Sequence, residues 1–177
     1  MSIKTAVFGG GCFWCTEAIF RETKGVQDVI SGFSGGKVRN PAYKEVCLGV
    51  TGHTEVVKVI YDELVISYEQ LFMLHLFTHD PTQLPINDVD KARQYRSVIF
   101  YQNEEERLIA EDVLKKMETH FKAPVITDLL PFEVFYQAED NHQNFYACNR
   151  DSYYAESVIE PKLDEYRKLK SSLFSDL

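Results

Sequence analysis

Three consecutive glycines at residues 9–11 separate a short apolar run, residues 3–8, from an amphipathic run that begins at Phe13. The apolar run is typical of a buried strand and the amphipathic run of a helix, and glycines allow the tight turn between them. The pattern places Cys12 at the helix N-terminus, where unpaired backbone N–H groups and the helix dipole stabilise a thiolate. We therefore expect a lowered pKa at Cys12 and interpret this residue as a nucleophile.

Length and charge restrict the class of protein. The 177 residues, of which 45% are hydrophobic, suffice for one substantial core, and we expect a single domain over residues 1–177. The net charge of −8 and the lack of a basic run disfavour nucleic acid and anionic lipid as partners. No apolar stretch has the length of a membrane span or the form of a signal segment. We expect a cytoplasmic protein.

Hydrophobic periodicity predicts the order of the elements. Apolar and β-branched runs predict strands at residues 3–8, 26–33, 55–61, 96–101 and 132–136, with a further candidate at 125–130. Apolar residues three and four positions apart predict helices at residues 13–22, 67–77, 103–121 and 157–169. Residues 34–52 and 78–94 are expected to be long irregular loops that belong to a site. This interleaving predicts an α+β fold with a mixed sheet covered by helices.

Cys12 and Cys15 form a C-x-x-C pair, and on a helix this spacing brings the two Cα atoms within reach of a disulfide. The pair is compatible with a thioredoxin-like dithiol, with half of a zinc site, and with a nucleophile beside a resolving thiol. Zinc would need a second ligand pair, and neither Cys47 nor Cys148 has a neighbouring Cys or His, so we expect no metal site. Core packing is the alternative for Cys15, and we interpret Cys47 as a packed thiol.

Other side chains suggest what surrounds the thiols. Phe13 and Trp14 are interpreted as an aromatic wall for a small apolar group, with core packing as the alternative. Glu55 opens a strand that is otherwise Val and Ile. We expect it to be half-buried with a raised pKa, as a general acid requires, although a solvated or capping role is the ordinary one. The polar cluster around His142 is expected to be a structural hydrogen-bond network, with metal binding as the alternative. Tyrosine hydroxyls such as that of Tyr95 can bind a polar oxygen without carrying charge, although most tyrosines only pack.

Seven motifs occur in one order, namely GGGCFWC, SGFSGG, NPAYKEVC, TGHTEVVKVIYD, HDPTQ, QYRS and AEDNHQ. With them the chain resembles the A-type peptide methionine sulfoxide reductases over about residues 5–143. The resemblance implies a single-domain two-layer α/β sandwich with a mixed, mostly antiparallel sheet and a ferredoxin-like core. It implies an enzyme that reduces the S epimer of methionine sulfoxide, free or in oxidised proteins, and so repairs oxidative damage. It also implies no bound cofactor and a dithiol reductant such as thioredoxin.

The resemblance also implies roles for individual residues. In that family a thiolate attacks the sulfoxide sulfur, a carboxylic acid protonates the departing oxygen, and methionine leaves a cysteine sulfenic acid behind. The matching positions make Cys12 the nucleophile and Glu55 the acid. The oxygen and a water would be held by three polar side chains, those of Tyr43, Asp90 and Tyr95.

Phe13 and Trp14 would form the pocket for the terminal methyl group. The C-terminal region departs from the family pattern, because members often place a recycling cysteine where this chain has Ala155. Recycling must then use Cys15, Cys148 or an external thiol, and we favour Cys15. Two other classes remain as alternatives, a general C-x-x-C thiol–disulfide oxidoreductase and a metal-organised or peptide-binding module without catalysis.

Overall fold

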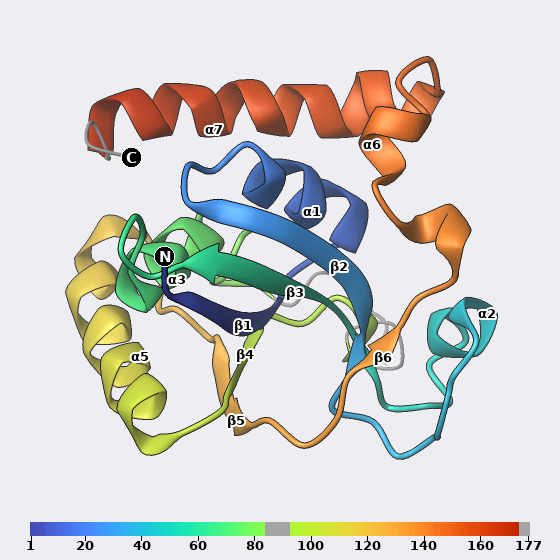
Figure 1. The fold of residues 1–177 in the computed structure, drawn as a ribbon, viewed down its shortest axis with the longest axis horizontal. Coiled ribbons are helices and arrows are strands. Elements are labelled where there is room, and N and C mark those ends of the chain that lie inside the picture. The colour runs from blue at the N-terminus through green and yellow to red at the C-terminus, as the bar shows by residue number, and fades with distance from the viewer. Residues whose placement is uncertain (84–92, 174–177) are drawn as a thin grey trace.

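The computed structural model describes residues 1–83 and 93–173 and contains a six-stranded sheet (Figure 1). Its order is β5-β4-β1-β3-β2-β6, and neighbouring strands are antiparallel except for β4 and β5, which are parallel. The predicted mixed, mostly antiparallel sheet is therefore confirmed. The strands are β1 (Ile3–Gly9), β2 (Val26–Ser34), β3 (Thr54–Asp62), β4 (Val98–Tyr101), β5 (Asp128–Pro131) and β6 (Tyr136–Gln137).

Two of the helices begin at a polar side chain that caps them. The Ser67 hydroxyl accepts from the Gln70 backbone N–H at 3.1 Å, and the Asn103 side chain accepts from the Glu106 N–H at 2.9 Å. The α-helices are α1 (Phe13–Arg21), α2 (Tyr43–Cys47), α3 (Tyr68–Leu76), α5 (Glu104–Met117), α6 (Phe145–Cys148) and α7 (Glu160–Leu173). Three shorter helices complete them, the 3₁₀ turns η1 (Glu118–His120) and η2 (Asp140–His142) and the π-helix η3 (Ala155–Ile159).

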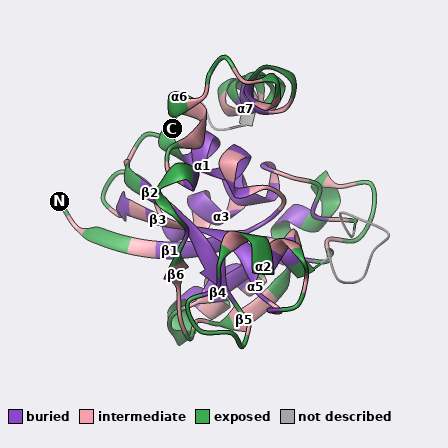
Figure 2. Cartoon of the chain, turned by 90° about the vertical axis from the view of Figure 1, so that its right-hand side faces the viewer, coloured by how far each residue is buried: buried purple, intermediate pink, exposed green. Residues whose placement is uncertain are grey.

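The two faces of the sheet are covered differently. Ala6 and Phe8 of β1 point into the main core, which α1 and α3 help to form, whereas Val7 between them joins a smaller cluster on the other face. Helix α1 lies between the sheet and α7, and α7 exposes its outer side (Figures 1 and 2). The layer of helices therefore lies on one face of the sheet. Cys12 lies at the edge of this layer, between the end of β1 and the start of α1.

The predicted elements agree with the structure along most of the chain, and two local predictions are wrong. Residues 132–135 do not form a strand, because β5 ends at Pro131, and only Tyr136 of the predicted run lies in a strand, β6. Phe132 and Phe135 are apolar since they pack on the second face of the sheet. The stretch 34–52, expected to be irregular, contains the short helix α2.

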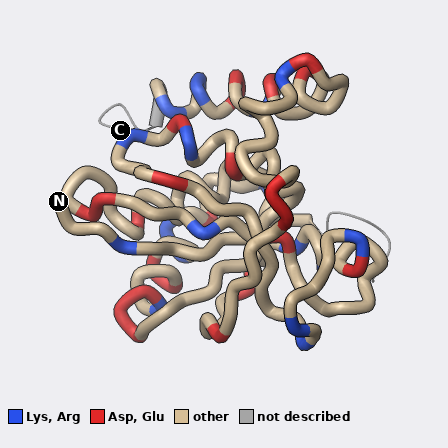
Figure 3. The backbone as a smooth tube through the Cα atoms, turned by 45° about the vertical axis from the view of Figure 1, so that its right-hand side comes forward, with Lys and Arg blue, Asp and Glu red and all other residues tan. Residues whose placement is uncertain are grey.

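Charge is spread along the chain. Lys and Arg lie interspersed with Asp and Glu, and α7 carries both signs (Figure 3). Within residues 1–83 and 93–173, no helix has the length and apolar character needed to cross a membrane.

Candidate active site

The turn from β1 to α1 is built around glycine. Gly11 has a φ of +69°, which favours glycine over residues with a Cβ. A Cβ on Gly10 would lie 2.5 Å from the ring of His79, so this position has no room for a side chain. The Gly9 carbonyl accepts a hydrogen bond from His75 Nε2 at 2.9 Å. His75 of α3 and His79, which follows the end of α3, therefore support the turn that precedes Cys12.

Cys12 is the N-cap of α1, and its carbonyl accepts from the Cys15 N–H at 3.1 Å. Its thiol hydrogen-bonds to the Cys15 thiol, and both thiols contact the hydroxyl of Tyr154. The Tyr154 oxygen lies 3.8 Å from Cys15 Sγ. The C-x-x-C spacing thus produces a pair of adjacent thiols that a tyrosine from the C-terminal segment covers.

The expected low pKa at Cys12 is wrong. The hydrogen bond to Cys15, burial and the neighbouring Glu55 raise the pKa of the Cys12 thiol, and no backbone N–H caps its side chain. The same hydrogen bond lowers the pKa of Cys15 to about 7. The pair of thiols therefore loses its first proton near neutral pH. The negative charge then lies on the Cys15 sulfur, and the Cys12 thiol donates a hydrogen bond to it.

Glu55 is more deeply buried than expected, with 1% of its surface exposed. Burial raises its pKa to about 7, although two donors oppose this shift. Gln94 Nε2 donates to one carboxyl oxygen at 2.9 Å, and the Phe13 backbone N–H donates to the other at 3.0 Å. The second bond fixes the carboxyl beside the residue that follows Cys12, and the raised pKa leaves a substantial fraction protonated at neutral pH.

A polar network joins this carboxyl to the loop that carries α2. Gln94 Nε2 also lies 3.4 Å from Cys47 Sγ, and Cys47 in turn hydrogen-bonds to the Tyr43 hydroxyl. Burial is the main cause of a raised pKa at both Tyr43 and Tyr95, and the nearby Glu55 adds to the shift. The two phenols therefore stay neutral and can donate hydrogen bonds. Cys47 is therefore part of the site and more than the packed thiol that we expected.

Aromatic rings surround the start of α1. Trp14 is partly exposed and stacks on Phe145, with ring centroids 3.7 Å apart. Its indole N–H donates to His142 Nδ1 at 3.3 Å, and the His142 ring lies 4.1 Å from that of Tyr43. Phe13 is fully buried and packs against Tyr43 and His142, so it forms the base of this cluster, and Trp14 forms its exposed wall.

The structure therefore brings together Cys12, Cys15, Glu55, Tyr43 and Tyr95, with the Tyr95 carbonyl accepting from the Gly11 N–H at 3.0 Å. Asp90 lies outside the described residues.

Sequence reasoning missed three further members, Gln94, Phe145 and Tyr154. Gln94 stands in the QYRS motif, which could have singled it out, whereas His142 of AEDNHQ was expected in a hydrogen-bond network and does accept a hydrogen bond from Trp14. Phe145 and Tyr154 carry no comparable signal, because only the tertiary fold brings them to α1. Cys148 is exposed at the end of α6.

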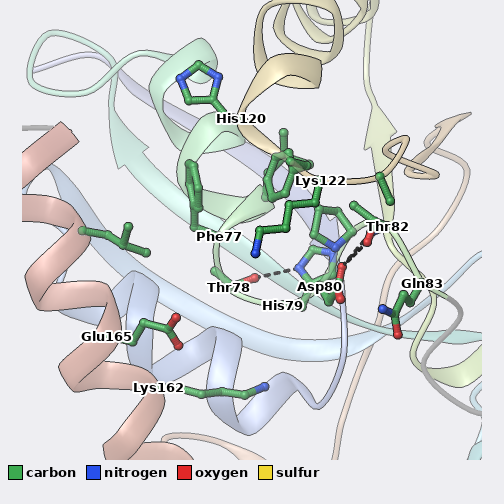
Figure 4. Close-up of a pocket in the computed structure, with 15 residues that line it drawn as sticks. Phe77, Thr78, His79, Asp80, Thr82, Gln83, His120, Lys122, Lys162 and Glu165 are labelled. Carbon is green, nitrogen blue, oxygen red and sulfur yellow. Dashed lines mark hydrogen bonds between the residues drawn. The ribbon is translucent and has the colours of Figure 1, made fainter.

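Open space lies beside this cluster. A cavity of about 710 Å³ is bounded by the end of α3, by residues 120–123 and by α7, and its walls include His79 and Lys162 (Figure 4). A second cavity of about 260 Å³ shares both residues and extends to Gly11 and Tyr95. Open space therefore reaches the turn before Cys12 from the side of α7, although Cys12 itself lines neither cavity.

Comparison with known proteins agrees with this geometry. The family model for peptide methionine sulfoxide reductase matches residues 4–173. The chain is 46% identical over 167 residues to peptide methionine sulfoxide reductase MsrA of Saccharolobus solfataricus, which covers 94% of both chains. It is 48% identical over 168 residues to MsrA of Nautilia profundicola, covering 94% of this chain and 95% of the relative.

Among solved structures, Mxr1 from Saccharomyces cerevisiae in its reduced form superposes with a TM-score of 0.79 at 28% identity, over 86% of this chain and 88% of the other. The family match covers nearly the whole sequence. It agrees with the observed sheet and with the helix that starts at the thiol pair. This chain belongs to the peptide methionine sulfoxide reductase family.

Proposed function

We propose that this protein reduces the S epimer of methionine sulfoxide, free or in oxidised proteins, to methionine, and so repairs oxidised proteins. The observation that carries the proposal is the 3.0 Å hydrogen bond from the Phe13 N–H to Glu55, which holds a buried carboxyl next to Cys12. A nucleophilic sulfur and a carboxyl with a pKa of about 7 at one helix N-terminus suit a reaction that needs attack and protonation together.

In the first step the Cys12 thiolate attacks the sulfoxide sulfur, and its electron pair forms the new S–S bond. The sulfur–oxygen bond breaks as the proton of Glu55 passes to the oxygen, which leaves as hydroxide. The hydroxide then adds to the Cys12 sulfur while the S–S bond breaks and its electron pair returns to the substrate sulfur, so that methionine and a Cys12 sulfenic acid result. Negative charge develops on the oxygen, so neutral donors such as Tyr43 and Tyr95 stabilise the transition state more than the ground state. Asp90 is proposed to help to hold the oxygen or a water.

Trp14 is the proposed wall for the terminal methyl group of the substrate. It presents a flat apolar ring held by Phe145 on one side and by the hydrogen bond to His142. The buried ring of Phe13 closes the base of the pocket. A sulfoxide of fixed hand places its methyl and its oxygen in different directions, so an apolar wall opposite polar donors selects one epimer.

Cys15 is the proposed resolving thiol. Its thiolate attacks the Cys12 sulfenic acid, a disulfide forms, and the hydroxyl leaves as water after taking up a proton. The hydrogen bond between the two thiols and the pKa of about 7 at Cys15 support this choice over Cys148, which is exposed on α6.

A dithiol reductant then reduces the disulfide. We name thioredoxin because Mxr1, whose fold this chain shares, has been solved in complex with Trx2. The cytoplasm is the proposed location, since a reducing compartment suits four cysteines that are all free.

The test is consumption of each methionine sulfoxide epimer with dithiothreitol as reductant. We expect only the S epimer to be consumed, Cys12→Ser to abolish turnover, and Glu55→Gln to retain part of it because an amide donates a hydrogen bond but cannot deliver a proton. Full activity in either variant, or equal consumption of both epimers, would contradict the proposal. Insulin reduction without methionine sulfoxide turnover would instead favour a general thiol–disulfide oxidoreductase.

A further inference from the structure

The segment after α6 places a tyrosine, Tyr154, next to the thiol pair. Tyr154 directly precedes the π-helix η3, and its hydroxyl lies 3.8 Å from Cys15 Sγ while its ring meets Trp14 edge-on at 5.3 Å. Single-turn π-helices widen the backbone locally and occur often at functional sites. The neighbouring Tyr153 points away from the protein and is 85% exposed. The segment therefore directs one of two adjacent tyrosines onto a reacting sulfur.

The same segment also brings a cation. Lys162 on α7 acts electrostatically on both Cys15 and His79, and it lines the smaller cavity, which reaches Gly11, as well as the larger one that Figure 4 shows. Within the described part of the chain, no ion pair neutralises its ammonium group. Its positive charge therefore favours a thiolate at Cys15 over the neutral thiol.

We propose that Tyr154 is a further catalytic residue, which donates a hydrogen bond to the Cys15 thiolate and promotes its attack on the Cys12 sulfenic acid, and that Lys162 assists it electrostatically. The proposal rests on the function proposed above and deepens its second step. It gives the C-terminal segment a chemical role even though Ala155 and the residues after it include no thiol.

The chemistry of the phenol restricts that role to hydrogen bonding. Burial, foremost, together with the nearby thiols, raises the pKa of Tyr154, so the hydroxyl keeps its proton throughout the reaction. In the resolving step the Cys15 electron pair forms the S–S bond, the Cys12 S–O bond breaks, and the hydroxyl takes its proton from the surrounding acid or water. Tyr154 thus orients and stabilises the attacking sulfur, and its own proton does not leave.

Four groups act on the charge of Cys15. The Cys12 thiol and the Tyr154 hydroxyl donate to it, and Lys162 attracts it, whereas Glu55 on β3 repels it when ionised. After the first step, Cys12 carries an oxygen and no longer donates its S–H to Cys15. Tyr154 is then the side-chain donor that remains at the Cys15 sulfur within the described residues.

The experiment compares Tyr154→Phe with the matched control Tyr153→Phe in one round of reaction. Fully reduced protein is mixed with methionine-S-sulfoxide without reductant. Methionine release is followed by chromatography, and disulfide formation by acid quench, alkylation and mass spectrometry. A rise of about one unit in the Cys15 pKa would lower its thiolate fraction at pH 7 by a factor of about five to ten. We therefore expect disulfide formation to slow about fivefold to tenfold in Tyr154→Phe, more than methionine release, with sulfenic acid accumulating and trappable by dimedone.

A second comparison tests the electrostatic part. Lys162→Met should slow disulfide formation about twofold, an effect that high salt removes, and Lys168→Met on the same helix should change nothing. In a Cys12→Ser background, ultraviolet titration of Cys15 should show a higher pKa with Tyr154→Phe but not with Tyr153→Phe.

Three results would overturn the inference: disulfide formation in Tyr154→Phe at the parent rate, both steps slowed by the same factor, or an unchanged Cys15 titration. If the parent releases one methionine per chain but Cys15 stays open to alkylation, the resolving role and this inference both fail while methionine sulfoxide reduction stands. A parent that releases no methionine refutes the proposed function itself.

Discussion

Replacing Gln94 by Met should move the pH dependence of the reaction upward. Gln94 Nε2 donates to Glu55 at 2.9 Å, and this bond stabilises the ionised carboxylate. Met has a similar length but no donor. A hydrogen bond to a charged group contributes about 1.5–3 kcal/mol, and one pKa unit corresponds to about 1.36 kcal/mol, so the loss raises the Glu55 pKa by about one to two units.

The effect depends strongly on pH. With a pKa of about 7, half of Glu55 is protonated at pH 7 and roughly 1% at pH 9. With a pKa of about 8 to 9, the protonated fraction at pH 9 becomes roughly 9–50%. If the protonated carboxyl is the acid, Gln94→Met should therefore react about tenfold to fiftyfold faster than the parent at pH 9, but less than twofold faster at pH 7.

The assay is the rate of methionine release in a single turnover at low substrate, measured from about pH 5.5 to pH 9.5 so that both limbs of the profile are covered. Omitting the reductant removes the titration of an external thiol from the profile. Arg93→Met, an exposed neighbour, is the control and should follow the parent. An alkaline limb that stays in place, or that moves to lower pH, would refute the assignment of this limb to Glu55. An equal loss at every pH would mean that Gln94 only positions the carboxyl.

Three further changes test the pocket, the turn and the core. Trp14→Ala removes the exposed wall and should raise KM for methionine sulfoxide about tenfold, and a change confined to kcat would contradict a binding role. Gly10→Ala places a Cβ 2.5 Å from the His79 ring, so urea denaturation should show a loss of about 1–3 kcal/mol, and unchanged stability would mean that the ring moves freely. Phe8→Ala empties a fully buried site that stacks on Phe20 at 5.6 Å and should cost about 3–5 kcal/mol in the same assay, whereas a loss below about 1 kcal/mol would contradict its place in the core.

Local features of the site could be predicted from the sequence because they depend on neighbouring residues. The strand, glycine turn and helix around Cys12 follow from patterns within residues 3–21, since β1 begins at Ile3 and α1 ends at Arg21. Glu55 could be assigned a raised pKa because it opens an apolar strand, and burial does raise it. Its full burial could not be predicted, since Gln94 arrives from another part of the chain.

Properties that depend on contacts between distant segments were missed or wrong. The helix N-terminus suggests a low pKa for Cys12, but burial, Glu55 and the partner thiol act in the opposite direction. Tyr154 meets Cys15 across 139 positions of the sequence, and no local pattern distinguishes it from Tyr153. Periodicity identifies which elements form, whereas these contacts depend on how α1, α6 and the π-helix pack against one another.

The matched pKa values of the thiol pair and Glu55 bear directly on why these groups are buried together. Reaction needs a thiolate and a carboxylic acid at the same moment. With ordinary pKa values for Cys and Glu, roughly 3% of thiols are ionised at pH 7 and roughly 0.2% of carboxyls are protonated, so about 0.006% of molecules hold both forms. With both values near 7, as for Cys15 and Glu55, about one quarter of molecules hold a Cys15 thiolate beside a protonated carboxyl. Attack by Cys12 still requires its proton to pass to Cys15, and the raised pKa of Cys12 opposes this transfer. Burial therefore serves the acid, because it keeps Glu55 protonated, whereas the hydrogen bond between the thiols is what places a negative charge at the pair near neutral pH.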